Sequence, residues 1–193
     1  MSLQDPNVVN PARTKRVAIV IANPATSTTT GWPVGFWWSE LTHSYYLLTE
    51  SGYEIEVFSP DGGPCKADAL SDPRDPSGYS ATDLITMGFI ATLSCAALVE
   101  NTRPVTDIDA DRFDAILVAG GQAPMFTFET ATALHKKFVE FYERGNVAGA
   151  LCHGDRVGPA AVLGLPLVGT LRALRQLPLV AVEDLQEAVV PLG

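Results

Sequence analysis

The sequence has few cysteines, and this shortage excludes two kinds of structural framework. Only Cys65, Cys95 and Cys152 occur among 193 residues, and they are widely spaced. An odd and scattered set argues against a disulfide framework and against a zinc site, and it favours a reducing compartment. We therefore expect a cytoplasmic protein without a metal ion.

Positive charge and long apolar runs are also scarce. The 13 Lys and Arg residues face 22 Asp and Glu residues, which gives a net charge of −9. An acidic chain without basic clusters argues against a nucleic-acid partner. No stretch approaches the roughly 18–20 apolar residues of a membrane span, and the first 16 residues lack the apolar region of a signal peptide. We expect neither nucleic acid nor membrane as a partner.

The length and composition are those of one ordinary globular domain. Hydrophobic residues make up 47% of the chain and charged residues 18%, and 193 residues are enough to enclose a sizeable core. The polar, proline-bearing start predicts an N-terminal arm over residues 1–15. A single domain is then expected over residues 16–193.

Apolar segments alternate with segments of helical periodicity. Helices are expected at 35–51, at 81–100 (one or two short ones) and at 129–144, where glycines follow the first and last as stop signals. Short, β-branched or apolar runs predict strands. These runs are 16–22, 53–58, 112–119 and 147–151. Strands alternating with helices predict an α/β fold with a mostly parallel sheet.

Three marked segments follow predicted strands directly. Residues 23–40, 120–125 and 152–154 come after strand ends, and in parallel sheets ligands bind beyond the carboxyl ends of the strands. We therefore expect these segments to form one site. Residues 59–79, rich in proline and glycine, form a long loop of the kind that is usually functional or a lid.

Cys152 ends an apolar strand and is followed by His153 and Gly154. A tight turn at this point can hold one side chain strained and exposed above the sheet, as in a nucleophile elbow. A helix N-terminus after the turn would lower the pKa of the thiol. The alternative is a small buried cysteine, which behaves as a core hydrophobe. The sequence leaves both interpretations open.

Thiol chemistry also needs a proton carrier and donors for developing negative charge. His153 is adjacent in sequence, although it can equally be a turn residue. Gly120 and Gly121 allow a close backbone approach, so one of their amides can join that of His153 as an oxyanion hole; the alternative is a simple turn. Glu40 lies among aromatic residues that would raise its pKa, unless it is a solvated acid of the first helical turn.

The remaining candidates are weaker. His43 lies three residues after Glu40 and can share its helix face, but no further ligand points to a metal there. His135 is expected on the surface of its helix. Cys65 is interpreted as an incidental loop thiol, and Cys95 as a core residue.

Three long segments in the correct order carry a family resemblance. They are residues 35–64, 113–125 and 135–154. The chain resembles the ThiJ/PfpI superfamily, which has the class I glutamine amidotransferase-like fold, and most closely its heat-shock chaperone and glyoxalase III branch. The resemblance implies a flavodoxin-like three-layer α/β/α sandwich. It also implies that Cys152 is the nucleophile, His153 its partner and Glu40 the buried glutamate.

The activity implied by the resemblance is the conversion of methylglyoxal to lactate, or of glyoxal to glycolate, without a cofactor. The implied partners are a small aldehyde substrate and a second copy of the chain in a homodimer. The alternatives are a holdase chaperone that exposes the aromatic residues 36–38, a cysteine-based redox sensor, other cysteine hydrolase or amidase chemistry of the superfamily, and an inactive homologue.

The sequence departs from the family pattern in two places. Gln122 and Ala123 replace the His-Gly pair that usually follows the paired glycines, which affects the oxyanion region and the choice of substrate. After Gly154 the resemblance fades, so residues 155–193 are interpreted as a divergent tail that is truncated or frame-shifted. The acid that supports the histidine in the family would then be sought among Glu183, Asp184 and Glu187.

Overall fold

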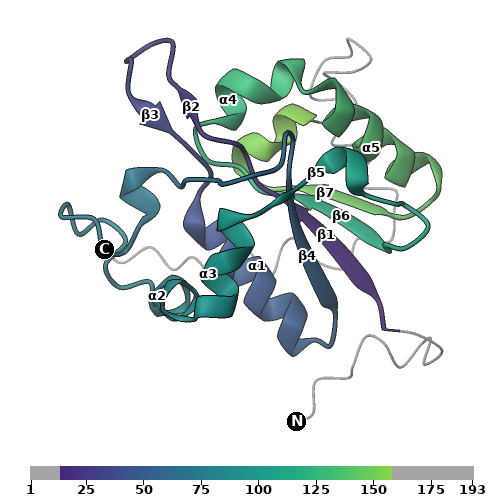
Figure 1. The fold of residues 1–193 in the computed structure, drawn as a ribbon, viewed down its shortest axis with the longest axis horizontal. Coiled ribbons are helices and arrows are strands. Elements are labelled where there is room, and N and C mark those ends of the chain that lie inside the picture. The colour runs from purple at the N-terminus through teal and green to yellow at the C-terminus, as the bar shows by residue number, and fades with distance from the viewer. Residues whose placement is uncertain (1–13, 158–193) are drawn as a thin grey trace. The chain divides into compact units, whose positions relative to one another are not determined.

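The computed structural model describes residues 14–157, whose centre is a parallel sheet (Figure 1). Five strands follow the order β5-β4-β1-β6-β7, and each neighbouring pair is parallel. The strands are β1 (Arg16–Val20), β4 (Glu54–Ser59), β5 (Arg103–Pro104), β6 (Ala115–Val118) and β7 (Val147–Ala150). The predicted parallel sheet is confirmed.

Helices cover both faces of this sheet (Figure 1). Helices α1, α2 and α3 lie on one side, and α4 and α5 lie on the other. Their bounds are α1 (Trp38–Glu50), α2 (Leu84–Ala91), α3 (Leu93–Glu100), α4 (Pro124–Thr127) and α5 (Thr132–Glu143). The three-layer α/β/α sandwich expected from the sequence is therefore present.

Strand β1 shows why the central strands are apolar throughout. Side chains alternate between the two faces of a strand. Val17 and Ile19 belong to the core cluster that contains Leu41 of α1. Ala18 and Val20 belong to the other cluster, with α5. Because both faces are covered, no position of β1 after Arg16 reaches water, and the strand reads as a continuous hydrophobic run.

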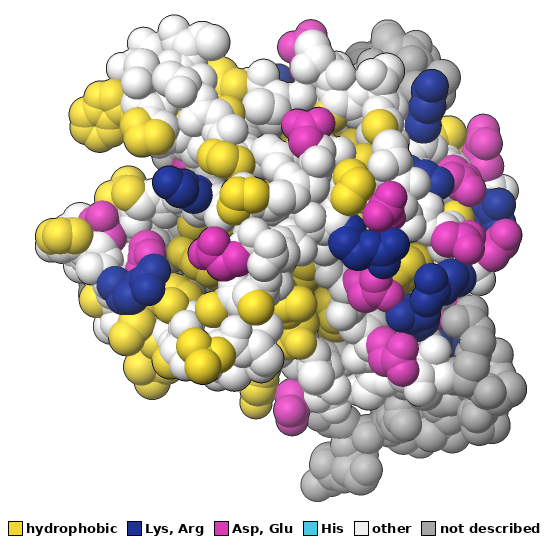
Figure 2. All heavy atoms as spheres, viewed as in Figure 1, with side chains coloured by type: hydrophobic (Ala, Val, Ile, Leu, Met, Phe, Trp, Pro, Cys, Tyr) yellow, Lys and Arg dark blue, Asp and Glu magenta, His cyan; other side chains and the backbone are white. Residues whose placement is uncertain are grey.

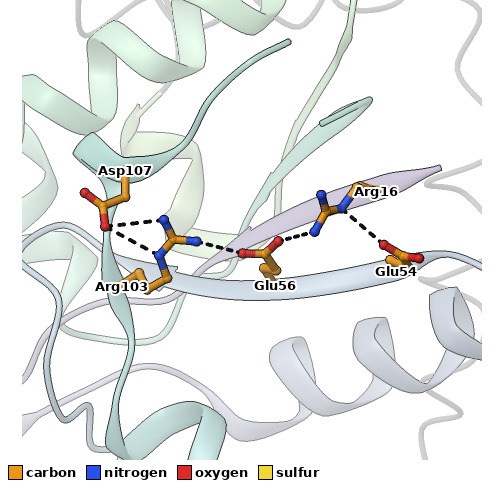
Figure 3. Close-up of polar contacts among 5 residues, drawn as sticks. All are labelled: Arg16, Glu54, Glu56, Arg103 and Asp107. Carbon is orange, nitrogen blue, oxygen red and sulfur yellow. Dashed lines mark hydrogen bonds and ion pairs between the residues drawn. The ribbon is translucent and has the colours of Figure 1, made fainter. Parts of the chain in front are cut away.

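An ion-pair network joins the strands β1, β4 and β5 (Figure 3). Glu56 lies between two arginines, at 2.5 Å from Nη2 of Arg16 and 3.0 Å from Nη1 of Arg103. Arg16 also pairs with Glu54 at 3.2 Å, and Arg103 pairs with Asp107 at 3.4 Å. The network therefore connects three neighbouring strands on the surface of the sheet.

The structure contains short elements that the sequence did not predict. Strand β5 has two residues, and so has each strand of the antiparallel hairpin β2 (Ala25–Thr26) and β3 (Pro33–Val34). Helix α4 is a single turn that starts at Pro124. Elements this short have no periodicity to detect. The predicted loop at 59–79 contains only one 3-10 turn, Ala69–Ser71.

Two predictions about exposure were wrong. His135 is not on the surface; it is 7% exposed, because it lies on the side of α5 that faces the sheet. The aromatic patch expected at residues 36–38 is largely buried, with Phe36 fully buried and Trp38 7% exposed. Their rings pack edge-to-face, 4.9 Å apart, within the core under α1.

The predicted arm and tail lie almost entirely outside the described residues. Only positions 14–15 and 155–157 of those two segments are described. Between residues 14 and 157, none of the helices has the length and hydropathy that crossing a membrane requires.

Candidate active site

Cys152 lies two residues after the end of β7, at the carboxyl end of the sheet. Since β1, β6 and β7 are neighbours, the segments after these three strands meet at one edge. Cys152 has a φ of 48°, and it is the only residue other than glycine with a positive φ between positions 14 and 157. This left-handed conformation costs roughly 1–2 kcal/mol in a residue with a side chain. A 3-10 turn, Cys152–Val157, follows, where the sequence indicated a helix.

The thiol of Cys152 is accessible. Cys152 is exposed, whereas Cys65 is buried and Cys95 half-buried. The alternative of a core cysteine at position 152 therefore does not hold. The strained and exposed geometry is that of a nucleophile elbow.

Four groups surround the sulfur of Cys152. The backbone N–H groups of Gly121 and His153 and the carboxyl group of Glu40 lie close enough to interact with it. The Nδ1 atom of His153 lies 3.6 Å from the sulfur and 3.1 Å from the carbonyl oxygen of Gly121. The structure therefore brings together the four residues that the sequence singled out.

Glu40 reaches this site from the first turn of α1. Its Oε2 accepts a hydrogen bond from the Gly120 N–H at 2.6 Å. Burial raises the pKa of Glu40, while the hydrogen bonds from Gly120 and Cys152 and the charge of His153 oppose the rise. The pKa of Glu40 is thus raised, as expected from its apolar surroundings, and a raised pKa makes a carboxyl group a better proton carrier.

The expected low pKa of Cys152 was wrong. Partial burial raises the pKa of this thiol, and the carboxylate of Glu40 raises it further, because a second negative charge nearby is unfavourable. The N–H groups of His153 and Gly121 act in the opposite direction but are outweighed. A thiolate is therefore favoured when Glu40 carries the proton, and the two groups titrate as a pair.

Gly121 can only be glycine in this arrangement. Its φ is 107°, and a Cβ atom would lie 2.6 Å from the carbonyl oxygen of Gly35 and from the backbone nitrogen of Trp37. The missing side chain lets the segment after β6 pass close to the segment before α1. In this position the carbonyl oxygen of Gly121 lies 3.1 Å from Nδ1 of His153, next to Cys152.

His43 lies apart from this arrangement. Its Nε2 is 2.9 Å from Oδ1 of Asp83, so it pairs with the N-cap of α2 instead of facing the thiol. No group of His, Cys, Asp and Glu in the described part of the chain has the geometry of a metal site. Glu183, Asp184 and Glu187, the candidates for a supporting acid, lie outside the described residues.

Asp68 is a residue of the site that sequence reasoning missed. It is 3% exposed, and its carboxylate accepts hydrogen bonds from the backbone N–H groups of Gly35 at 2.8 Å and Gln122 at 2.7 Å. Burial raises the pKa of Asp68, and the charge of Asp68 contributes to the raised pKa of Glu40. The only available signal was the unusual length of the loop 59–79, which does not single out one residue.

The chain is similar in sequence to known proteins. Residues 34–163 match the model of the DJ-1/PfpI family. The glutathione-independent glyoxalase hsp3101 of Schizosaccharomyces pombe is 28% identical over 129 residues, which are 67% of this chain and 51% of that protein. Glyoxalase 3 of Candida albicans is 24% identical over 61% of this chain and 48% of that protein. The chain therefore spans about half the length of these two relatives.

Solved structures share the same fold. The rapid encystment protein 24 kDa of Francisella tularensis superimposes with a TM-score of 0.66 and 27% identity, covering 81% of this chain and 65% of that one. Glyoxalase III of Candida albicans gives a TM-score of 0.61 at 22% identity, covering 74% of this chain and 59% of that one. The α/β/α layers are thus those of known proteins.

Proposed function

Since the chain belongs to the DJ-1/PfpI family, we propose that it is an enzyme of the glyoxalase III type, which converts a small 2-oxoaldehyde to a hydroxy acid without a cofactor. The observation that carries the proposal is the exposed, strained Cys152, whose sulfur contacts Glu40 and two backbone N–H groups. The names of the two curated relatives, a glutathione-independent glyoxalase and a glyoxalase 3, support it.

The first step is addition to the aldehyde. The thiolate of Cys152 attacks the aldehyde carbon of methylglyoxal, a C–S bond forms, and the electron pair of the C=O bond moves to oxygen. Glu40, once it has taken the proton that the thiol gives up, delivers that proton to the oxygen. The product is a neutral hemithioacetal bonded to Cys152.

An internal transfer of hydrogen follows. His153 or Glu40 removes the proton from the carbon that bears sulfur, and the neighbouring ketone becomes the hydroxyl end of an enediol. Return of a proton to that second carbon, with loss of the hydroxyl proton from the carbon that bears sulfur, yields the thioester of lactate with Cys152. The former aldehyde carbon is oxidised and the ketone carbon reduced, so no external oxidant is needed. Water then cleaves the C–S bond and releases lactate and the thiol.

The backbone N–H groups of Gly121 and His153 stabilise the charge on the substrate oxygen. Both already point to the sulfur, and an oxygen on the carbon attached to sulfur comes within their reach. Donors fixed before the reaction contribute roughly 3–4 kcal/mol each in other enzymes. We expect this to be the largest single contribution of the site.

The test is lactate formation from methylglyoxal by the purified full chain, without glutathione or any added cofactor. Cys152→Ser is expected to abolish the product, whereas Cys95→Ser, a matched change at a half-buried thiol outside the site, is expected to retain it. Lactate formation that survives Cys152→Ser unchanged, or its absence from the unmodified protein, contradicts the proposal.

A holdase is the second candidate function, favoured by a different surface from the one predicted. Apolar side chains gather over α2 and its neighbours at the lower left of Figure 2. Leu84 is 78% exposed and Leu93 88% exposed, and exposed patches of this kind bind unfolded chains. Suppression of citrate synthase aggregation by the Cys152→Ser variant, with no lactate formed by the unmodified protein, would favour this role.

The exposed thiol also suits a redox sensor, because exposure is one of the two properties that favour oxidation of a cysteine, the other being a low pKa. Mass spectrometry after peroxide treatment distinguishes this role, since a sensor yields sulfinate at Cys152 at peroxide levels that leave Cys95 intact.

Two further proposals follow from the family relationship: a cytoplasmic location and a homodimer. Light scattering of the full chain at several concentrations tests the homodimer.

A further inference from the structure

Asp68 joins two segments that both line the site of Cys152. One oxygen of its carboxylate accepts the Gly35 N–H, just before α1, and the other accepts the Gln122 N–H, just after the paired glycines. The side chain is almost completely buried. Both acceptor oxygens are therefore used for main-chain groups of loops that are far apart in sequence.

The backbone around Asp68 holds the start of α1 as well. The Asp68 N–H donates to the carbonyl oxygen of Phe36 at 2.8 Å. The hydroxyl of Ser71 donates to the carbonyl oxygen of Asp68 at 2.7 Å and accepts the N–H of Trp38, the first residue of α1, at 3.1 Å. Since Glu40 lies in the first turn of this helix, its position depends on the same loop.

The second segment carries the groups that face the thiol. The Gln122 N–H held by Asp68 is one residue from Gly121, whose N–H points to the sulfur of Cys152 and whose carbonyl oxygen lies 3.1 Å from Nδ1 of His153. A shift of Gln122 would therefore move an N–H donor of the thiol and a contact of the imidazole together.

We propose that Asp68 is a positioning residue of this site: its carboxylate ties the Gly35 and Gln122 segments together and so keeps the Gly121 N–H aimed at the sulfur of Cys152. Its two carboxylate oxygens are bonded to the N–H groups of Gly35 and Gln122, so it acts through the backbone that it holds. The inference rests on the proposed role of Cys152 but not on the identity of the substrate.

The test measures alkylation of Cys152 by iodoacetamide as a function of pH in the full chain, followed by mass spectrometry of the peptide that contains it. Two variants are compared with the unmodified protein. Asp68→Asn keeps the shape but loses one acceptor and the charge. Asp68→Glu keeps the charge and both oxygens but displaces them by one methylene group, so it tests position separately from charge.

Asp83→Asn is the matched control. Asp83 is another carboxylate that accepts a backbone N–H, that of Thr86 at 3.0 Å, but it is less buried than Asp68 and caps α2. The Asp83→Asn variant is expected to change the stability of the protein without changing the pH profile of Cys152 alkylation. Thermal unfolding of all variants is recorded alongside, so that loss of folding is recognised.

Loss of a well-aimed donor makes the thiolate less favourable. We expect the midpoint of alkylation to rise by about 0.5–1 pH unit in both Asp68 variants, or about 3–10-fold slower alkylation at neutral pH. The result from either Asp68 variant is sufficient to test the proposal, provided that this variant folds. A midpoint that stays at the value of the unmodified protein, or an equal rise in Asp83→Asn, overturns the proposal. Because alkylation needs no aldehyde substrate, this outcome is independent of whether lactate is formed.

Discussion

The carboxyl group of Glu40 in α1 and the thiol of Cys152 after β7 interact directly, so neither group ionises independently of the other. Glu40 raises the pKa of the thiol, while the thiol and the Gly120 N–H hold the carboxyl group in place. The pair can hold one proton and pass it between the two groups. This arrangement links the reactivity of the thiol to a proton carrier at the same point.

Replacing Glu40 by Gln separates these two effects. The amide carries no charge, so the pKa of Cys152 falls, and alkylation at neutral pH is expected to be about tenfold faster, which corresponds to a shift of about one pH unit. Lactate formation is expected to fall by about 10²–10⁴-fold, because the proton carrier is lost. Glu50→Gln, in an exposed position of the same helix, is the control and should change neither rate. Slower alkylation in Glu40→Gln would contradict the assigned coupling.

The strained backbone of Cys152 predicts a difference between two variants that both lack the thiol. Glycine adopts the φ of 48° without strain, whereas alanine does not. We expect Cys152→Gly to exceed Cys152→Ala by about 1 kcal/mol in the free energy of unfolding. Urea unfolding of the two proteins measures this difference. A more stable alanine variant would show that the left-handed conformation carries no strain.

The N-cap of α2 predicts a pH-dependent stability. Burial opposes ionisation of Asp83, but hydrogen bonds from Thr86 and His43 outweigh it and hold its pKa below the usual 3.8. A carboxyl group with a lowered folded pKa stabilises above its unfolded pKa, and this contribution is lost as the pH falls through the folded value.

Asp83→Ala is therefore expected to cost about 1 kcal/mol at neutral pH through the lost cap. The difference between variant and unmodified protein should shrink as the pH falls below about 3.8. Thermal unfolding between pH 7 and pH 3 measures it. A difference that stays constant over this range would mean that the charge of Asp83 does not contribute.

The ion-pair network of Figure 3 predicts a modest and salt-dependent contribution. Glu56 contacts both Arg16 and Arg103 and is 27% exposed, while Glu54 contacts only Arg16 and is 58% exposed. Glu56→Gln is expected to cost about 1 kcal/mol at low salt and less at high salt, and Glu54→Gln should cost less than that. Urea unfolding at two salt concentrations checks the order. Equal costs for the two variants would show that the central position of Glu56 has no effect.

Much of the fold could be predicted because the main elements carry a clear pattern. The run from Arg16 to Ala22 is apolar because both faces of β1 are covered, and Gly52 and Gly145, at positive φ, end the two long helices. The exposure of single side chains could not be predicted in the same way. His135 has a polar side chain in a polar helix sequence, and only its place on α5 buries it.

The site was predictable where a residue directly follows a strand, and less so elsewhere. Cys152 and Gly121 follow β7 and β6, so their meeting at one edge of the sheet follows from the topology. Asp68 could not be found, because it lies in a loop without periodicity and acts through backbone groups at Gly35 and Gln122. The pKa of Cys152 depends on the distance between its sulfur and the carboxyl group of Glu40. The spacing of the two residues in the sequence does not give that distance.

Both N–H groups that face the sulfur belong to the main chain, and this has a consequence for protein engineering. A substitution changes a side chain and leaves the backbone amide at that position in place. The side chain of Gln122 is exposed, while its N–H is held by Asp68. Libraries of variants at position 122 can therefore change the side chain at the rim of the site, while the backbone N–H groups of Gly121 and His153 keep their positions.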